Sequence, residues 1–266
     1  MDAEASEGAE ARMTPATLRD LGGAGQPVLM IPGLCGTAPE WSATAAWTTD
    51  THHGYVLEPC GHGDAERHPA DVSRAAHVAD TAAALAHIGP AVLIGQSLGG
   101  HPALLTAAAY PSLVSALVLA EAGPGGPDDA TVRDIRAWLA SGPALFPDRA
   151  TAAEFLGGGP VGAAWAAGLR RGPEGLRPAF DPEVMTATLA AAVGPRWDEF
   201  DAVTCPTLLV TGEHGVLPAD EVARMERHPY VRSVRIPGAG HDVHLDSADA
   251  WRAALSGFLR AQAPPR

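Results

Sequence analysis

The chain has 266 residues, of which 46% are hydrophobic and 18% charged, with 30 glycines and 24 prolines. This composition is typical of a globular protein, and a single α/β unit of this length buries about three quarters of the surface of its unfolded chain. No segment has the ~20 consecutive apolar residues of a transmembrane helix. The formal net charge of −13 repels phosphate backbones and anionic lipid head groups, which argues against nucleic-acid binding and a membrane-surface role.

The cysteines and the first residues bear on the compartment. The three cysteines, Cys35, Cys60 and Cys205, are odd in number and widely spaced, which fits neither a disulfide framework nor a metal site. They are expected to be free thiols that pack as small hydrophobic residues, in a cytoplasmic protein. Residues 1–13 are acidic and lack the pattern of a signal peptide, so they are predicted to form a disordered tail.

Short apolar runs alternate with helical patterns, which predicts an α/β fold with a mostly parallel sheet flanked by helices. The expected strands are residues 27–31, 55–57, 91–94, 116–120, 207–211 and 231–236, and the expected helices among them are 76–88, 98–110 and 248–261.

The middle of the chain differs from this alternation. Strand patterns are absent there, and Gly and Pro residues separate four short helical patterns, at residues 129–140, 149–156, 161–169 and 182–193. We therefore predict a core formed by residues 14–122 and 196–266, with a helical cap inserted at residues 123–195.

The sequence Gly95-Gln-Ser97-Leu98-Gly99 directly follows an apolar strand pattern and directly precedes a helical one. It matches G-x-S-x-G, a motif that presents a nucleophilic serine on a sharp turn from strand to helix. The two glycines remove Cβ atoms that would collide in so tight a turn. Because the N-terminus of a helix favours negative charge, the Leu98 N–H is a candidate donor to an oxyanion beside Ser97.

With this elbow in place, the chain from Thr17 to Leu259 resembles the α/β-hydrolase family. The resemblance implies an α/β-hydrolase fold, no cofactor and no metal, and a catalytic triad in the chain order serine, acid, histidine. It also implies that the Leu34 N–H is the second oxyanion donor, although Pro32 replaces the usual histidine of that loop. Members with aspartate at the elbow, such as haloalkane dehalogenases and epoxide hydrolases, differ from this chain at Ser97.

A serine hydroxyl needs a neighbouring base, and the pKa of histidine suits that task near neutral pH. Among the 11 histidines, the resemblance selects His241, which follows the last expected strand and precedes the final helix. His244 is expected to line the pocket or the following turn.

The acid of the triad is where the sequence departs from the family. The family pattern after the fifth expected strand is Gly-x-x-Asp, whereas this chain reads Gly-Glu213-His-Gly215, with glycine in place of the acid. Some lactonases and dehalogenases of this fold carry the acid instead at the end of the strand after the nucleophile helix, where this chain has Glu121. We assign the acid to Glu121. The alternatives are that Glu213 or Asp242 is the acid, or that the chain has no acid in this role.

These residues predict a serine hydrolase that cleaves a small carboxylic ester or lactone through an acyl-enzyme on Ser97, and the position of Glu121 favours a lactonase. Carbon–carbon bond hydrolases, acyltransferases and cofactor-free perhydrolases share the same triad. A non-catalytic pseudo-hydrolase that only binds a ligand also stays open, because the usual aspartate is absent. The oligomeric state cannot be read from the sequence.

The pocket is expected to lie between the cap and the loop after the first expected strand. Candidates for an apolar lining are Trp41, Trp47, Trp138, Trp165 and Trp197. The pair Arg170-Arg171 is interpreted as solvated, with contact to an anionic substrate as the alternative.

Overall fold

A seven-stranded sheet forms the centre of the computed structural model, which describes residues 16–262. The predicted tail, residues 1–13, lies outside this range. The spatial order of the strands is β1-β3-β2-β4-β5-β8-β9, with β1 antiparallel to β3 and the other pairs parallel. The strands are β1 (Thr17–Gly23), β2 (Pro27–Ile31), β3 (His53–Glu58), β4 (Ala91–Gln96), β5 (Val114–Ala120), β8 (Thr207–Gly212) and β9 (Val231–Ile236). The predicted fold class is confirmed.

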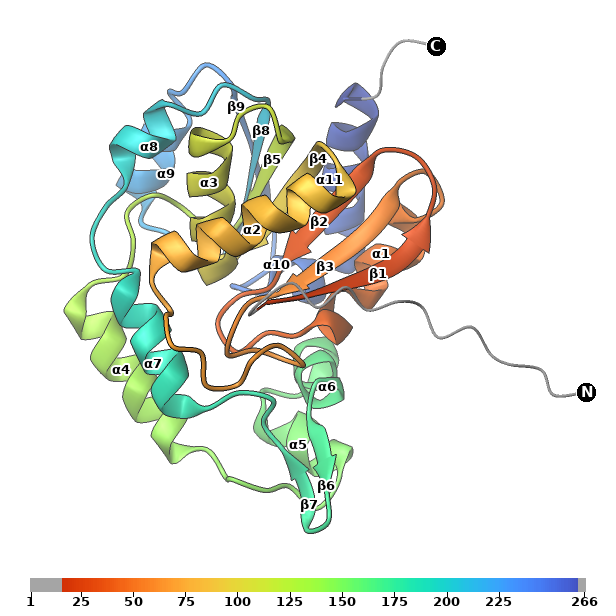
Figure 1. Cartoon of the computed structure of the whole chain (residues 1–266), viewed down its shortest axis with the longest axis vertical. Helices are drawn as coiled ribbons and strands as arrows, with labels where there is room; N and C mark the ends of the chain where they lie inside the picture. The colour runs from red at the N-terminus through yellow and green to blue at the C-terminus, as the bar shows by residue number, and fades with distance from the viewer. Residues whose placement is uncertain (1–15, 263–266) are drawn as a thin grey trace, which may run out of the picture.

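Helices cover both faces of this sheet (Figure 1). One face packs against α2 (Arg74–Ile88), α3 (Gly100–Ala109), α8 (Trp197–Asp201) and α9 (Ala219–Met225). The other packs against η1 (Ala38–Trp41) and α11 (Ala248–Gln262), with α1 (Ser42–Thr48) beside them and α10 (Val243–Asp246) close to the site. Neighbouring residues of one strand enter different clusters: Leu93 packs on the first face, and Val92 and Ile94 on the second. Burial on both faces explains why the central strands are apolar throughout.

The segment between β5 and β8 contains the four helices expected there. They are α4 (Asp129–Ser141), α5 (Arg149–Phe155), α6 (Gly159–Ala167) and α7 (Pro182–Ala191). An aspartate side chain accepts a backbone N–H bond at the start of α4, α5 and α7, which satisfies amides that the helix itself leaves free. The segment also contains a hairpin that the sequence pattern did not predict, β6 (Arg170–Gly172) and β7 (Gly175–Arg177).

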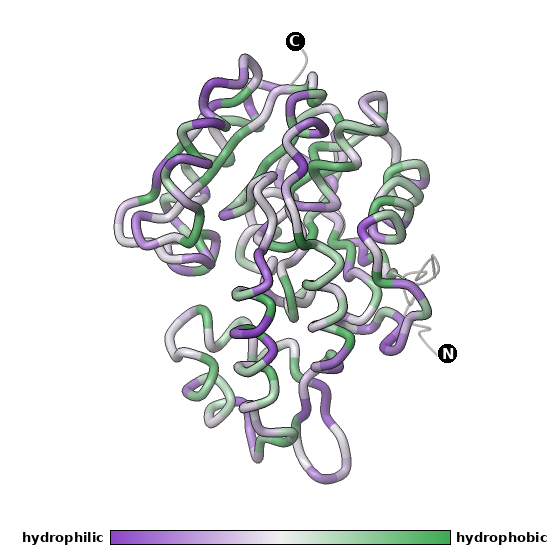
Figure 2. The backbone as a smooth tube through the Cα atoms, turned by 90° about the vertical axis from the view of Figure 1, so that its left-hand side faces the viewer, coloured by the Kyte–Doolittle hydropathy of each residue, from purple (hydrophilic) through white to green (hydrophobic). Residues whose placement is uncertain are grey.

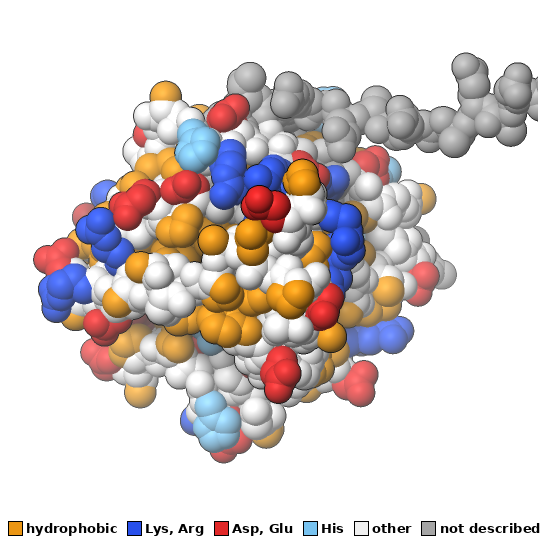
Figure 3. All heavy atoms as spheres, turned by 90° about the horizontal axis from the view of Figure 1, so that it is seen from below, with side chains coloured by type: hydrophobic (Ala, Val, Ile, Leu, Met, Phe, Trp, Pro, Cys, Tyr) orange, Lys and Arg blue, Asp and Glu red, His pale blue; other side chains and the backbone are white. Residues whose placement is uncertain are grey.

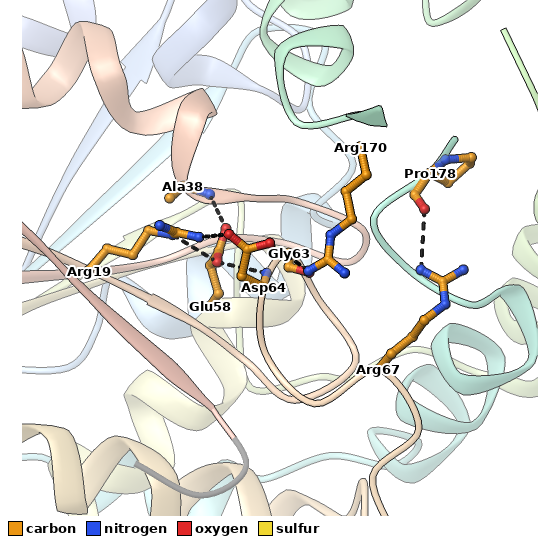
Figure 4. Close-up of polar contacts among 8 residues, drawn as sticks. All are labelled: Arg19, Ala38, Glu58, Gly63, Asp64, Arg67, Arg170 and Pro178. Carbon is orange, nitrogen blue, oxygen red and sulfur yellow. Dashed lines mark hydrogen bonds and ion pairs between the residues drawn. The ribbon is translucent and has the colours of Figure 1, made fainter. Parts of the chain in front are cut away.

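Residues 123–195 of this segment form the lower part of the molecule in Figures 1 and 2, and we call them the cap. The helix α8, which follows them, packs against the sheet. An ion-pair network joins the hairpin of the cap to the core. Arg170 donates to Asp64 Oδ1 at 2.6 Å and to the Gly63 carbonyl, and Asp64 also pairs with Arg19. Arg19 in turn lies 3.0 Å from the buried Glu58 carboxylate (Figure 4). Arg170 is therefore not simply solvated, as the sequence analysis expected, but ties the cap to the core.

In residues 16–262, no helix is both long enough and apolar enough to cross a membrane.

Candidate active site

Ser97 lies on a tight elbow between β4 and the short helix η2 (Ser97–Gly99), which leads into α3. Its φ angle is 49°, a left-handed conformation that is uncommon for a residue with a side chain. A Cβ on Gly95 would lie 2.6 Å from Gly100 Cα, and a Cβ on Gly99 would lie 2.6 Å from the Ile31 carbonyl oxygen. Gly95 therefore permits the tight turn, and Gly99 permits the close approach of residues 31–32, while Ser97 keeps a strained backbone conformation.

His241 lies in the loop between β9 and α10, and its ring reaches the elbow. Its Nε2 is 2.7 Å from Ser97 Oγ, which is hydrogen-bond distance. A hydroxyl and an imidazole at this distance can transfer a proton directly, as nucleophilic catalysis by serine requires. The structure thus brings together the two side chains that the sequence selected, 144 residues apart.

Glu121 follows β5, is 2% exposed, and also has a left-handed φ angle, 47°. Its Oε2 lies 3.6 Å from His241 Nδ1, slightly beyond hydrogen-bond distance, and that nitrogen has no other partner within residues 16–262. Its two oxygens accept N–H bonds from Gly212 at 2.8 Å and Val216 at 2.7 Å. Burial raises the pKa of Glu121, but the contacts with His241, Gly212 and Val216 outweigh it and hold the pKa below its usual value. Glu121 is therefore a carboxylate at neutral pH.

The glycine in the usual acid position explains how Glu121 fits there. A Cβ built on Gly215 would overlap Glu121 Oε1 and lie 2.5 Å from Oε2. The carboxylate of Glu121 thus reaches across to the loop after β8 and fills the space beside Gly215. The missing side chain at position 215 makes room for the carboxylate of Glu121, which follows the neighbouring strand.

The two alternative acids point elsewhere. Glu213 is exposed, and its carboxylate accepts the Gly238 N–H at 2.8 Å. Asp242 Oδ1 lies 3.4 Å from Gln96 Nε2. Neither alternative carboxylate is paired with the His241 ring in the structure, whereas Glu121 lies beside it.

The loop after β2 passes directly beside the elbow. A Cβ on Gly33 would overlap Gln96 Oε1 and lie 3.1 Å from the Ser97 Cβ, so the glycine permits a close approach of this loop to the elbow. The loop turns at Cys35, which has a φ angle of 66°, and Gly36 N–H donates to the Gly33 carbonyl at 3.0 Å. The Leu34 amide lies within this turn. Leu98 is the second residue of η2, where first-turn amides lack an acceptor inside the helix.

His244 is the second residue of α10, and it is buried in the core instead of lining a pocket. Its ring stacks on Trp41 with a centroid distance of 4.5 Å and packs edge-on against Trp251. Within the described residues neither ring nitrogen has a hydrogen-bond partner. Burial, with a smaller contribution from His241, lowers the pKa of His244 from 6.5 to about 3.

This buried histidine predicts instability in acid. Between pH 6.5 and 3 the unfolded chain binds a proton at His244 and the folded chain does not. The free energy of unfolding therefore has its full value above pH 6.5 and decreases as the pH falls. From pH 7 to pH 5, the free energy of unfolding should decrease by about 2 kcal/mol less in His244→Phe than in the wild type. Urea denaturation at both pH values measures this difference. Equal losses would mean that His244 is protonated in the folded protein.

A cavity of about 300 Å³ lies between the cap and the core. Cys35, next to Leu34, contributes to its wall, whereas Ser97 and His241 do not. Of the tryptophans considered, Trp138 and Trp165 line the cavity. The other three lie elsewhere: Trp41 in the core, Trp47 beneath Arg252, and Trp197 against Phe200 and Arg224.

The cavity wall includes two arginines that the sequence analysis did not select, Arg67 and Arg177. Their only sequence signal was positive charge, which does not distinguish them from the arginines on the surface. Within residues 16–262, no group of three or more His, Cys, Asp and Glu side chains is arranged to hold a metal ion.

A strained serine elbow at the end of a parallel strand, with a histidine beside it, is characteristic of the α/β-hydrolase fold class. Residues 28–254 match the family model described as "Alpha/beta hydrolase family". The chain belongs to this family, and it is a hydrolase.

Two curated relatives are similar to the chain over most of its length. It is 26% identical over 251 residues to 2-(acetamidomethylene)succinate hydrolase of Mesorhizobium japonicum, covering 90% of each chain. It is 27% identical over 256 residues to N-formylmaleamate deformylase of Pseudomonas putida, again covering 90% of each. A crystal structure of E-2-(acetamidomethylene)succinate hydrolase has a TM-score of 0.84 and 24% identity, covering 92% of this chain and 95% of that one.

Proposed function

We propose that this protein is a serine hydrolase that cleaves a carboxylic ester or lactone through an acyl-enzyme on Ser97. The observation that carries the proposal is the 2.7 Å contact between Ser97 Oγ and His241 Nε2, at an elbow where Ser97 has a left-handed φ angle. His241 takes the hydroxyl proton while Ser97 Oγ attacks the carbonyl carbon. The resulting oxyanion accepts hydrogen bonds from the Leu34 and Leu98 N–H groups, each worth about 3 kcal/mol in the transition state.

The reaction then completes in three further proton transfers by the same histidine. His241 gives its proton to the leaving alkoxide oxygen as the carbon–oxygen bond breaks, which leaves the acyl group on Ser97. A water molecule then attacks the acyl-enzyme, His241 takes its proton, and the proton returns to Ser97 Oγ as the acid product leaves. Glu121 orients the ring through the Nδ1 side and stabilises the imidazolium that forms twice in this cycle.

The names of the relatives support a second candidate for the bond that the protein cleaves in its substrate. A deformylase, by its name, removes a formyl group, and both relatives are named for derivatives of succinate or maleamate. The same acyl-enzyme mechanism cleaves an N-acyl group if His241 protonates a leaving nitrogen instead of an oxygen. Amide-type substrates therefore stand beside esters and lactones as the second candidate.

Stoichiometric labelling by a fluorophosphonate tests the proposal, because the reagent reacts with activated serines. We expect rapid labelling of the wild-type protein at one site and none of Ser97→Ala, since Ser97 is the one serine within residues 16–262 that is hydrogen-bonded to a histidine. Hydrolysis of 4-nitrophenyl esters, γ-lactones and N-formyl amides by the labelled and unlabelled proteins then identifies the bond. Folded wild-type protein that resists the reagent would contradict the catalytic role and favour a binding protein.

A further inference from the structure

The cavity beneath the cap combines an apolar wall with two positive side chains. Most of its lining is hydrophobic, including Trp138, Phe155 and Trp165, and Arg67 and Arg177 are the charged residues on its wall. Large hydrophobic side chains of the cap are also exposed, among them Leu145 and Phe155. Figure 3, which views the molecule from the cap end, shows hydrophobic side chains gathered on this face with basic side chains beside them.

Arg67 is held in place by neutral groups only. Its Nη1 donates to the Pro178 carbonyl at 3.3 Å (Figure 4). Its Nη2 donates to the Phe180 carbonyl at 2.6 Å. A guanidinium has five N–H donors, so three remain for a ligand. Within the described residues, no carboxylate lies within ion-pair distance of Arg67 or Arg177, whereas Asp64 already pairs with Arg170.

The surroundings of Arg67 make an added anion favourable. Burial lowers its pKa, and Arg170 and Arg177 lower it further, which together outweigh the effect of Asp181. The carboxylate of Asp181 is also engaged as the cap of α7, where it accepts the N–H groups of Glu183 and Val184. A positive charge in a partly buried, mainly apolar wall is stabilised by a bound carboxylate, since charge-assisted hydrogen bonds are among the strongest in proteins.

The cavity lies next to the proposed oxyanion loop. Cys35 lines the cavity and directly follows Leu34, whose N–H is the proposed oxyanion donor. Leu34 packs against the same hydrophobic cluster as Trp165 and Phe180, which also contribute to the cavity wall. A substrate whose carbonyl reaches Ser97 can therefore place its far end beneath the cap.

We propose that the cavity binds the apolar part of a substrate that ends in a carboxylate, and that Arg67 binds this carboxylate with help from Arg177 at the rim. The inference rests on the proposed acyl-enzyme function and adds the class of substrate. The volume of about 300 Å³ is at the lower end for small-molecule sites, which suits a short chain or one ring. The local positive charge also offsets a net charge of −13 that would repel an anionic substrate.

The test compares two substrates that differ in one charge: the mono-4-nitrophenyl ester of adipic acid and 4-nitrophenyl hexanoate. We expect the wild-type protein to have the higher kcat/KM for the acid. In Arg67→Met the ratio of the two kcat/KM values should fall about 10- to 100-fold, the range for a hydrogen bond to a charged group. Arg133→Met is the matched control, because Arg133 is an exposed arginine of α4 that does not line the cavity, and its ratio should stay unchanged.

Binding to Ser97→Ala separates this inference from the proposed function. Calorimetry should show 3-phenylpropionate binding to Ser97→Ala but not to Ser97→Ala/Arg67→Met, and 3-phenylpropanol binding much more weakly to either. Equal affinity for the acid and the alcohol would overturn the inference even if Ser97 is labelled. Arg67-dependent binding of the acid in a protein that resists the fluorophosphonate would keep the anion site and refute the hydrolase.

Arg67 also holds two carbonyls of the cap, so the folding of Arg67→Met has to be checked by circular dichroism. Should this variant be unfolded, Arg177→Gln replaces it in the test, since Arg177 is exposed and its side chain makes no hydrogen bond or ion pair within residues 16–262. Its ratio of kcat/KM values should fall at least about threefold, as expected for a more exposed charge. An unchanged ratio would refute the role of the arginine pair.

Discussion

Replacing Glu121 by glutamine should lower kcat by three to four orders of magnitude, about the cost of losing the orienting carboxylate of a serine triad. The amide keeps the size of the side chain but removes the negative charge opposite His241 Nδ1. It also places an NH₂ group against one of two backbone donors, Gly212 or Val216, that now bond to carboxylate oxygens. Stopped-flow kinetics on an activated ester and the rate of fluorophosphonate labelling both measure this loss.

Glu213→Gln is the matched control, since Glu213 is the acidic residue nearest in sequence to position 215, where the family carries its acid. Its carboxylate bonds to Gly238 and not to the histidine, so kcat should change less than twofold. A large loss in Glu213→Gln together with a small one in Glu121→Gln would move the acid to the loop after β8.

Gly99→Ala should remove most of the activity and destabilise the fold by about 3 kcal/mol, at the upper end for overpacking, because the obstacle is backbone. A Cβ at this position overlaps the Pro32 carbonyl and lies 2.6 Å from the Ile31 carbonyl. The elbow and the oxyanion loop would have to separate, which displaces both Ser97 and the Leu34 amide. Urea denaturation and kcat, measured on the same preparation, should both show the effect.

Gly257→Ala is the control for this substitution. Gly257 lies inside α11, and a Cβ there has no neighbour within 4 Å. Alanine should therefore stabilise the protein by about 0.5–1 kcal/mol through its higher helix propensity and leave kcat unchanged. Wild-type stability and activity in Gly99→Ala would show that the elbow is looser than the structure indicates.

The sequence predicted the central strands well because they are buried on both faces and therefore apolar throughout, as in residues 91–94. It missed β1 (Thr17–Gly23), whose half-exposed edge includes Arg19 and Asp20, so no apolar run marks it. The hairpin of β6 and β7 was missed for a similar reason, because its three-residue strands consist mainly of arginine and glycine. Short elements that tertiary contacts stabilise leave little trace in a local pattern.

Ser97 could be selected because its sharp turn requires the G-x-S-x-G motif. His241 could be selected because it follows the last expected strand and precedes the final helix. No comparable signature marks Glu121, and its assignment also depended on the absence of a side chain at position 215. The reason that position is empty became visible only in three dimensions, where the Glu121 carboxylate fills the space. Arg67 could not be selected at all, because its importance depends on which acceptors surround it.

The shared volume of Glu121 and Gly215 has an evolutionary consequence. An aspartate at position 215 and Glu121 in its present position exclude each other, because a Cβ at position 215 would overlap the Glu121 carboxylate. If Glu121 is the acid, as proposed, exchanging it one substitution at a time for an aspartate at position 215 would pass through a form with neither carboxylate. That form should turn over slowly because it lacks the orienting group, and the same step should hinder the reverse exchange.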